Sequence, residues 1–186
     1  MKTKLLSWMT IVMMAFACVG LSACSSDDDD NGGGSGSNSS SGVTVSAKYG
    51  YYTKESGDWC FWFFNKTPGS DGWFSGNVEM VMIAVKSSSS TIPEGEFSGN
   101  FEVEVSKSNA STQTATYWES GSESETTGKV TIKKSGSGYT ISYTGVTLYE
   151  YDDNDKRVNT INNCSFSYTG SLTQLPSNFL DDDDDK

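Results

Sequence analysis

Apolar residues recur at every second position through much of the chain that follows Val43. An alternation of period two places successive side chains on opposite faces of a β-strand, whereas a helix repeats its apolar positions every three to four residues. Residues 97–105 show the alternation clearly, because Phe101 and Val103 share one parity while Glu102 and Glu104 take the other. The pattern predicts strands and no helical stretch of any length.

Two stretches are apolar at consecutive positions instead, namely 59–64 and 78–85, where only Glu79 is charged. A strand with apolar side chains on both faces needs cover on both faces, so these two strands are predicted to lie centrally. At Gly145 the inward parity changes, and this change indicates a β-bulge.

Turns and loops separate about eight strands of this kind. They are expected to cover residues 43–52, 59–64, 78–85, 97–105, 114–118, 130–133, 139–148 and 164–172. Such connections suit antiparallel pairing. The predicted fold class is therefore all-β, either an antiparallel β-sandwich or a meandering barrel of about eight strands.

The first residues of the chain have a different pattern. Lys2 and Lys4 precede an almost wholly apolar run, residues 5–20, which falls short of the roughly 20 residues that a membrane-spanning helix needs. A basic start followed by a short apolar run and small residues is typical of an export signal. Leu-Ser-Ala-Cys, which ends at Cys24, resembles the bacterial lipobox. The resemblance implies cleavage before Cys24 and lipidation of that residue, with an ordinary signal peptide as the alternative.

Four aspartates at positions 27–30 follow Cys24 closely. This acidic run resembles the export signal of surface lipoproteins from Bacteroidota, which implies a lipid-anchored position on the outer face of the outer membrane. A periplasm-facing position is the alternative. Residues 31–42 are only Gly, Ser and Asn, a composition that behaves as a flexible coil. We expect a signal peptide at 1–23, a lipidated cysteine and disordered linker at 24–42, an all-β domain at 43–180 and an acidic tail at 181–186.

Composition and charge exclude several functions. The two aspartate runs supply nine of the 24 acidic residues, and the domain keeps 15 acidic residues against ten basic ones. This mild acidity argues against nucleic acid, which needs clustered Lys and Arg. The sequence has no histidine, so Ser-His-Asp and Cys-His catalysis are excluded. We predict no enzyme, no cofactor and no metal site; the acidic turn at 152–155 lacks the glycine and distal glutamate of an EF-hand.

The segments 138–145 and 166–172, with the Ile-Pro-Glu-Gly turn at 92–95, resemble the closing hairpin and a turn of small uncharacterised Bacteroidota lipoproteins. The resemblance covers about half of the domain and implies no catalytic residues.

Two cysteines, Cys60 and Cys164, lie in the domain. An even count in an exported protein permits a disulfide, which would close a long loop. Two buried free thiols are the alternative, and no spacing rule decides between them.

Aromatic residues are the most informative candidates for a binding site. Trp59 and Trp62 are expected in the core, because aromatic side chains favour strands and cross-strand packing. The candidates for ligand contact lie beside a Gly-rich turn or a polar loop, and they are Trp73, Phe74, Tyr117 and Trp118.

The predicted function is that of an outer-membrane lipoprotein facing the cell exterior, whose non-catalytic β-domain binds an extracellular ligand such as a glycan. Its expected partners are the membrane, through the lipid anchor, and an extracellular glycan or surface protein. Two alternatives remain open. One is a structural or protein-partner subunit, or an adhesin, of a surface complex, and the other is a calycin-like barrel for an apolar ligand.

Overall fold

The computed structural model describes residues 42–55, 57–69, 74–109, 112, 114–122, 124–152 and 154–175. The predicted signal peptide, linker, lipidation site at Cys24 and acidic tail lie outside these residues. The all-β class is confirmed, since the described residues form strands and no helix. The strands are β1 (Tyr49–Glu55), β2 (Asp58–Phe64), β3 (Asn77–Lys86), β4 (Gly95–Phe97), β5 (Phe101–Asn109), β6 (Thr114–Ser120), β7 (Lys129–Ser135), β8 (Gly138–Tyr151), β9 (Arg157–Gly170) and β10 (Leu172–Gln174).

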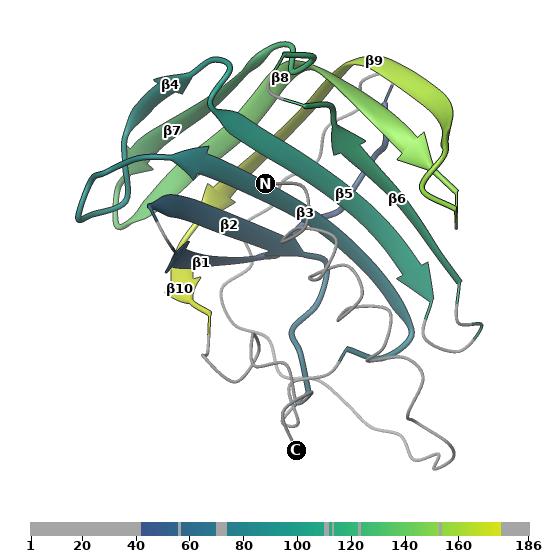
Figure 1. Ribbon diagram of the computed structural model, residues 1–186. Coiled ribbons are helices and arrows are strands. Elements are labelled where there is room, and N and C mark those ends of the chain that lie inside the picture. Colours follow the sequence, from purple (N-terminus) through teal and green to yellow (C-terminus); the bar gives the residue numbers. More distant parts are fainter. Residues whose placement is uncertain are drawn as a thin grey trace, which may run out of the picture.

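All ten of these strands belong to one sheet, which curls into an open half-barrel (Figure 1). Its order is β10-β1-β2-β3-β5-β6-β8-β7-β4, with β9 paired to β8. The pairing is antiparallel except between β1 and β10. Because β9 pairs with β8 and continues through Ser171 into β10, which pairs with β1, the chain itself connects the two sides of the curl. The sequence predicted about eight strands. The single strand expected at 97–105 is divided into β4 and β5, and the short strand β10 was not predicted.

The long strand β8 carries two neighbours on one edge. Its first half pairs with β7, and its second half pairs with β6 through Leu148 and Glu150. The register with β9 shifts between Thr144 and Val146, where Gly145 has a φ of 71°. The bulge expected at Gly145 is confirmed, and beyond it the β8–β9 hairpin extends alongside β6.

The concave face of the sheet holds the main hydrophobic core. Phe63 on β2 lies with its ring centroid 5.3 Å from that of Phe166 and 4.8 Å from that of Tyr168, both on β9. Rings from strands far apart in the sheet meet only on the side toward which the sheet curls. Side chains from β2, β3, β5, β7, β8 and β9 fill this interior, many of them without solvent exposure.

The convex face carries a second, smaller apolar cluster. Its buried members are Trp62, Phe64, Val78, Met80, Met82 and Leu175. All of these except Leu175 alternate along β2 and β3 with residues of the main core, so both strands bury side chains on both faces. The prediction that 59–64 and 78–85 form central strands, covered on both sides, is confirmed.

The two domain cysteines lie in different clusters. Cys164 is buried in the main core, and its thiol donates to the carbonyl oxygen of Ile161 at 3.4 Å. Cys60 packs against the smaller cluster on the convex side. No disulfide joins them. Of the two arrangements that the sequence left open, the structure contains the one with separate thiols, of which only Cys164 is fully buried.

Candidate ligand-binding site

The neighbouring candidates Tyr117 and Trp118 point to opposite faces of β6, as successive residues of a strand must. Trp118 is paired with Glu150 and packs against the main core on the concave face. Its indole Nε1 donates to Glu150 Oε2 at 3.2 Å, and Asn159 Nδ2 donates to the same oxygen at 3.2 Å. Trp118 is therefore held in the interior of the curl and does not share a surface with Tyr117.

Phe74 is partly buried by packing against other apolar side chains. Its ring centroid lies 4.6 Å from that of Phe64, within the convex cluster. Trp73, the remaining candidate of this group, lies outside the described residues. The sequence thus grouped four aromatic residues, of which Tyr117 alone is placed at a surface with other candidate contacts.

Tyr117 lies on the convex face beside Tyr151 of β8. The two rings are parallel within 6°, with centroids 6.0 Å apart, and both are partly exposed. Parallel rings at this separation are offset from one another, which is a favourable arrangement for aromatic pairs. The Tyr117 hydroxyl donates to Asp155 Oδ1 at 3.3 Å. Partial burial, with the Asp155 charge as a second cause, raises the pKa of Tyr117 to about 12.

Arg157, the first residue of β9, lies against the same surface. The central carbon of its guanidinium stands 3.6 Å from the ring centroid of Tyr149. One terminal nitrogen donates to Glu125 Oε1 at 3.3 Å, and the other donates to the Tyr151 hydroxyl at 3.3 Å. These contacts raise the pKa of Arg157 further above its usual value. A guanidinium fixed by a ring face and two hydrogen bonds has little freedom left to reorient.

The loop after β6 supplies Glu125. Its Oε2 accepts hydrogen bonds from the Ser122 backbone N–H at 3.2 Å and the Ser122 hydroxyl at 2.8 Å. These bonds, together with Arg157, lower the pKa of Glu125. Gly121 makes the approach possible: a Cβ at this position would lie 2.7 Å from Glu125 Cβ and 2.9 Å from a ring carbon of Tyr149. The loop can therefore close on the sheet only with glycine there.

The acidic turn between β8 and β9 holds Asp155 in place. Asp152 Oδ1 accepts the backbone N–H groups of Asn154 and Lys156, each at 3.0 Å. Asp155 takes a left-handed φ of 56°, which Asp tolerates better than most residues. The Asp152 carboxylate is thus used by the backbone, and within the described part of the chain no group of three or more acidic or cysteine side chains is arranged to hold a metal ion.

We call these side chains the tyrosine–arginine cluster. It consists of Tyr117, Tyr149, Tyr151, Arg157, Glu125 and Asp155. As a candidate ligand contact, only Tyr117 of these six was singled out from the sequence. Tyr149, Tyr151 and Arg157 follow the alternation of an ordinary strand pair, and their meeting with Glu125 depends on the register of β6 with β8. Chemically, the cluster offers partly exposed ring surface, a fixed cationic donor and two carboxylate acceptors.

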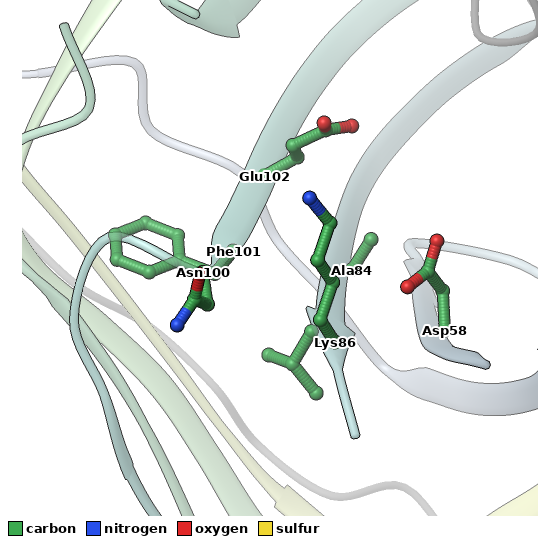
Figure 2. A pocket seen from close by; sticks show the side chains of 7 residues that line it. Asp58, Ala84, Lys86, Asn100, Phe101 and Glu102 are labelled. Carbon is green, nitrogen blue, oxygen red and sulfur yellow. The ribbon is translucent and has the colours of Figure 1, made fainter. Parts of the chain in front are cut away.

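A depression on another part of the surface is a weaker candidate (Figure 2). It lies over the ends of β2, β3 and β5, where Ala84 is small and Asp58, Lys86 and Glu102 carry charge; the Lys86 ammonium extends toward Glu102. The volume that it encloses is only about 20 Å³. Ligand pockets usually enclose roughly 300–1,000 Å³. The depression is therefore too small and open to hold a ligand of ordinary size.

A buried carboxyl group lies on the convex face of the sheet, between β3 and β6. Glu104 on β5 is paired with Met82 on one side and Glu119 on the other, and it is 6% exposed. Its Oε1 has no hydrogen-bond partner among the described residues. Burial, with smaller contributions from Glu119 and Glu102, raises the pKa of Glu104 to about 8. At neutral pH this side chain is mostly protonated.

Comparison with known proteins adds no further constraint: no family model, no curated protein and no solved structure matches the chain. Within its described part, the chain has no helix long and apolar enough to cross a membrane.

Proposed function

We propose that this protein is a lipid-anchored protein of the outer-membrane surface whose β-domain binds an extracellular glycan at the tyrosine–arginine cluster, without catalysing a reaction. The observation that carries the binding proposal is the pair of parallel, partly exposed rings of Tyr117 and Tyr151, bordered by fixed hydrogen-bonding side chains. Ring faces bury the apolar C–H surface of a sugar, while flanking polar groups bond its hydroxyls.

The anchor half of the proposal is supported by the lipobox that ends at Cys24 and by the aspartates at 27–30. Each buried methylene contributes roughly 0.8 kcal/mol to membrane attachment, and one acyl chain holds a protein only marginally. Several chains on one cysteine make attachment lasting. The Gly/Ser/Asn segment that follows separates the β-domain from the membrane.

The chemistry of the cluster supports binding more than turnover. Glu125 is engaged by Arg157 and Ser122, and its lowered pKa keeps it ionised at neutral pH. Asp155 accepts from Tyr117. General acid catalysis by a carboxyl group needs a raised pKa instead. Glu104 has such a raised pKa, but it is buried outside the cluster.

Binding is tested with the full chain in mild detergent, on a glycan array and by affinity gel electrophoresis. Tyr117→Ala and Tyr151→Ala should each abolish or strongly weaken retention. Trp118→Phe is the matched control, because it changes the adjacent aromatic residue on the opposite face and keeps most of its core packing. Retention that survives in both tyrosine variants, or absence of binding to every glycan, would refute the proposal.

Anchoring is tested separately with Cys24→Ser. The native chain should stay with the outer membrane in plain buffer, carry a modified amino terminus at Cys24 and be accessible to protease added to whole cells. The variant should lose the modification. A native protein that washes from cells with an unmodified terminus would contradict the anchor and leave the binding test intact.

A role with a protein partner is a second candidate. Val158, beside Arg157 on β9, is 53% exposed and is the large apolar side chain that stands out on the described surface. Cross-linking from membranes would favour this role if one stoichiometric partner is recovered regardless of added sugar. The calycin-like alternative has less support, because side chains fill the concave interior.

A further inference from the structure

The tyrosine–arginine cluster also carries information on the charge of its ligand. Arg157 is held on three sides, by the Tyr149 ring, Glu125 and the Tyr151 hydroxyl. These two hydrogen bonds engage two of the five N–H groups of a guanidinium. The other N–H groups lie at the rim of a flat, immobilised cation whose residue is exposed. Such a group can donate to neighbouring oxygen atoms of a ligand without losing further side-chain freedom.

The charge around Arg157 is negative. Glu125 neutralises the guanidinium directly, at 3.3 Å. Asp155 lies on the other side of the tyrosine pair, bonded to Tyr117, and Glu119 is paired with Tyr149 in the strand register. Three carboxylates therefore border a surface that holds one fixed cation, Arg157, and one exposed cation beside it, Lys156. A ligand carrying carboxylate or sulfate groups would meet repulsion there, and like-charge contacts are an effective way to reject a ligand.

We propose that this site takes an uncharged, hydroxyl-rich saccharide, and that Arg157 is the donor that selects it. This inference rests on the proposed function and deepens it. The rings of Tyr117 and Tyr151 receive the apolar side of a sugar. Arg157 donates to its hydroxyl oxygens, while the acceptor oxygens of Asp155 and Glu125 receive its hydroxyl hydrogens. An uncharged sugar has both donors and acceptors in each hydroxyl and suits this mixed set.

The experiment uses the full chain in mild detergent on an array of neutral and anionic polysaccharides. The array includes one matched pair, homogalacturonan with its carboxylates free or methyl-esterified. Binding should be confined to neutral members. Arg157→Gln should weaken it about tenfold to a hundredfold, because hydrogen bonds from a charged group are lost. Arg157→Lys, which keeps the charge without the planar donors, should also weaken it. Lys156→Gln removes the adjacent charge as a control and should change little.

Every other outcome overturns a specific part of the proposal. Preference for anionic members refutes the inference and leaves glycan binding standing. Neutral binding that is unchanged in Arg157→Gln refutes the role of Arg157. No binding to any member overturns the proposed function as well. Circular dichroism of each variant reports folding, and Tyr151→Phe, which removes one hydroxyl that accepts from Arg157, gives a milder change at the same contact with an expected smaller loss of affinity.

Discussion

The two faces of this one sheet differ in how completely their side chains are satisfied. On the concave face, apolar side chains meet across the curl, and a buried polar group such as the Ser120 hydroxyl has a partner, accepting the Val103 N–H at 3.0 Å. The convex face carries Thr53 Oγ1 and Glu104 Oε1, two buried oxygens that find no hydrogen-bond partner in the described part of the chain. It also carries the tyrosine–arginine cluster.

The difference separates the face that supplies most of the packing from the face that carries the proposed binding site. Buried polar groups without partners cost free energy, and proteins keep them mostly where another requirement applies. The concave face is a packing solution that many apolar sequences satisfy. The convex face combines a small apolar cluster, a mostly protonated carboxyl and a partly exposed aromatic surface. We infer that it is the face on which contact with other molecules constrains the sequence.

The largest effect is expected from the concave face. Phe63→Ala removes a ring with no solvent exposure that touches Phe166 and Tyr168. Truncation of a buried Phe costs about 3–5 kcal/mol in unfolding free energy. The matched variant Phe64→Ala, on the next residue and the opposite face, should cost less, because a smaller cluster surrounds it. Urea unfolding of both variants measures the difference, and equal losses would show that the two faces contribute equally.

The second-largest expected effect is a gain in unfolding free energy, and it comes from substitution of Glu104. Its pKa of about 8 in the folded chain lies above the 4.5 of an ordinary glutamate. The unfolded chain therefore releases this proton at lower pH, and stability falls as pH rises between those two values. Glu104→Gln removes the penalty and should stabilise the protein by about 3 kcal/mol at pH 7. The advantage should shrink toward zero near pH 4.

Urea unfolding of Glu104→Gln and the parent at pH 4, 7 and 9 checks this prediction. Glu102→Gln, on the same strand face two residues away, is the control, and its stability relative to the parent should change much less with pH. A destabilised Glu104→Gln at pH 7 would mean that the ionised carboxylate is bound by a favourable partner, and the contrast between the faces would weaken accordingly.

Much of the fold follows from alternation along the chain. Period two gives the strands, double-sided apolar runs give central β2 and β3, and a parity change locates the bulge at Gly145. β4 was joined to β5 in one predicted strand, and β10 was missed, because three residues carry too little periodicity. The curl itself depends on contacts such as Phe63 with Phe166, which join distant parts of the sequence.

The candidate site was much less predictable. Alternation could have separated Tyr117 from Trp118, since adjacent residues of a strand face opposite ways. The meeting of Arg157 with Tyr149 and Glu125 depends on strand register and on a loop closure that no local pattern specifies. Gly121 was indistinguishable in the sequence from the other glycines of polar loops.

The third effect tests that loop closure. Gly121→Ala places a methyl group within 2.9 Å of Tyr149 and closer to Glu125, so the loop must move from the sheet. Overpacking of this kind costs about 1–3 kcal/mol, and glycan affinity should fall because Glu125 no longer holds Arg157. Gly136→Ala is the control for crowding, because a Cβ at Gly136 would contact nothing. The φ of 58° at Gly136 still adds backbone strain to that variant. Hydrogen exchange of residues 121–126 should rise in Gly121→Ala alone, and unchanged exchange there would contradict the packing argument.

The smallest effect separates a ring from its hydroxyl. Tyr117→Phe keeps the ring beside Tyr151 and loses the donor to Asp155, whose bond of 3.3 Å is long and partly exposed. Such hydrogen bonds contribute about 0.5–1.5 kcal/mol, so the unfolding free energy should change by about 1 kcal/mol or less. Glycan affinity should stay within about threefold of the parent, whereas Tyr117→Ala loses the ring surface. Calorimetry with a neutral glycan from the array measures the affinity of both variants. If Tyr117→Phe and Tyr117→Ala lose affinity equally, recognition depends on the hydroxyl and Asp155 and not on the aromatic face.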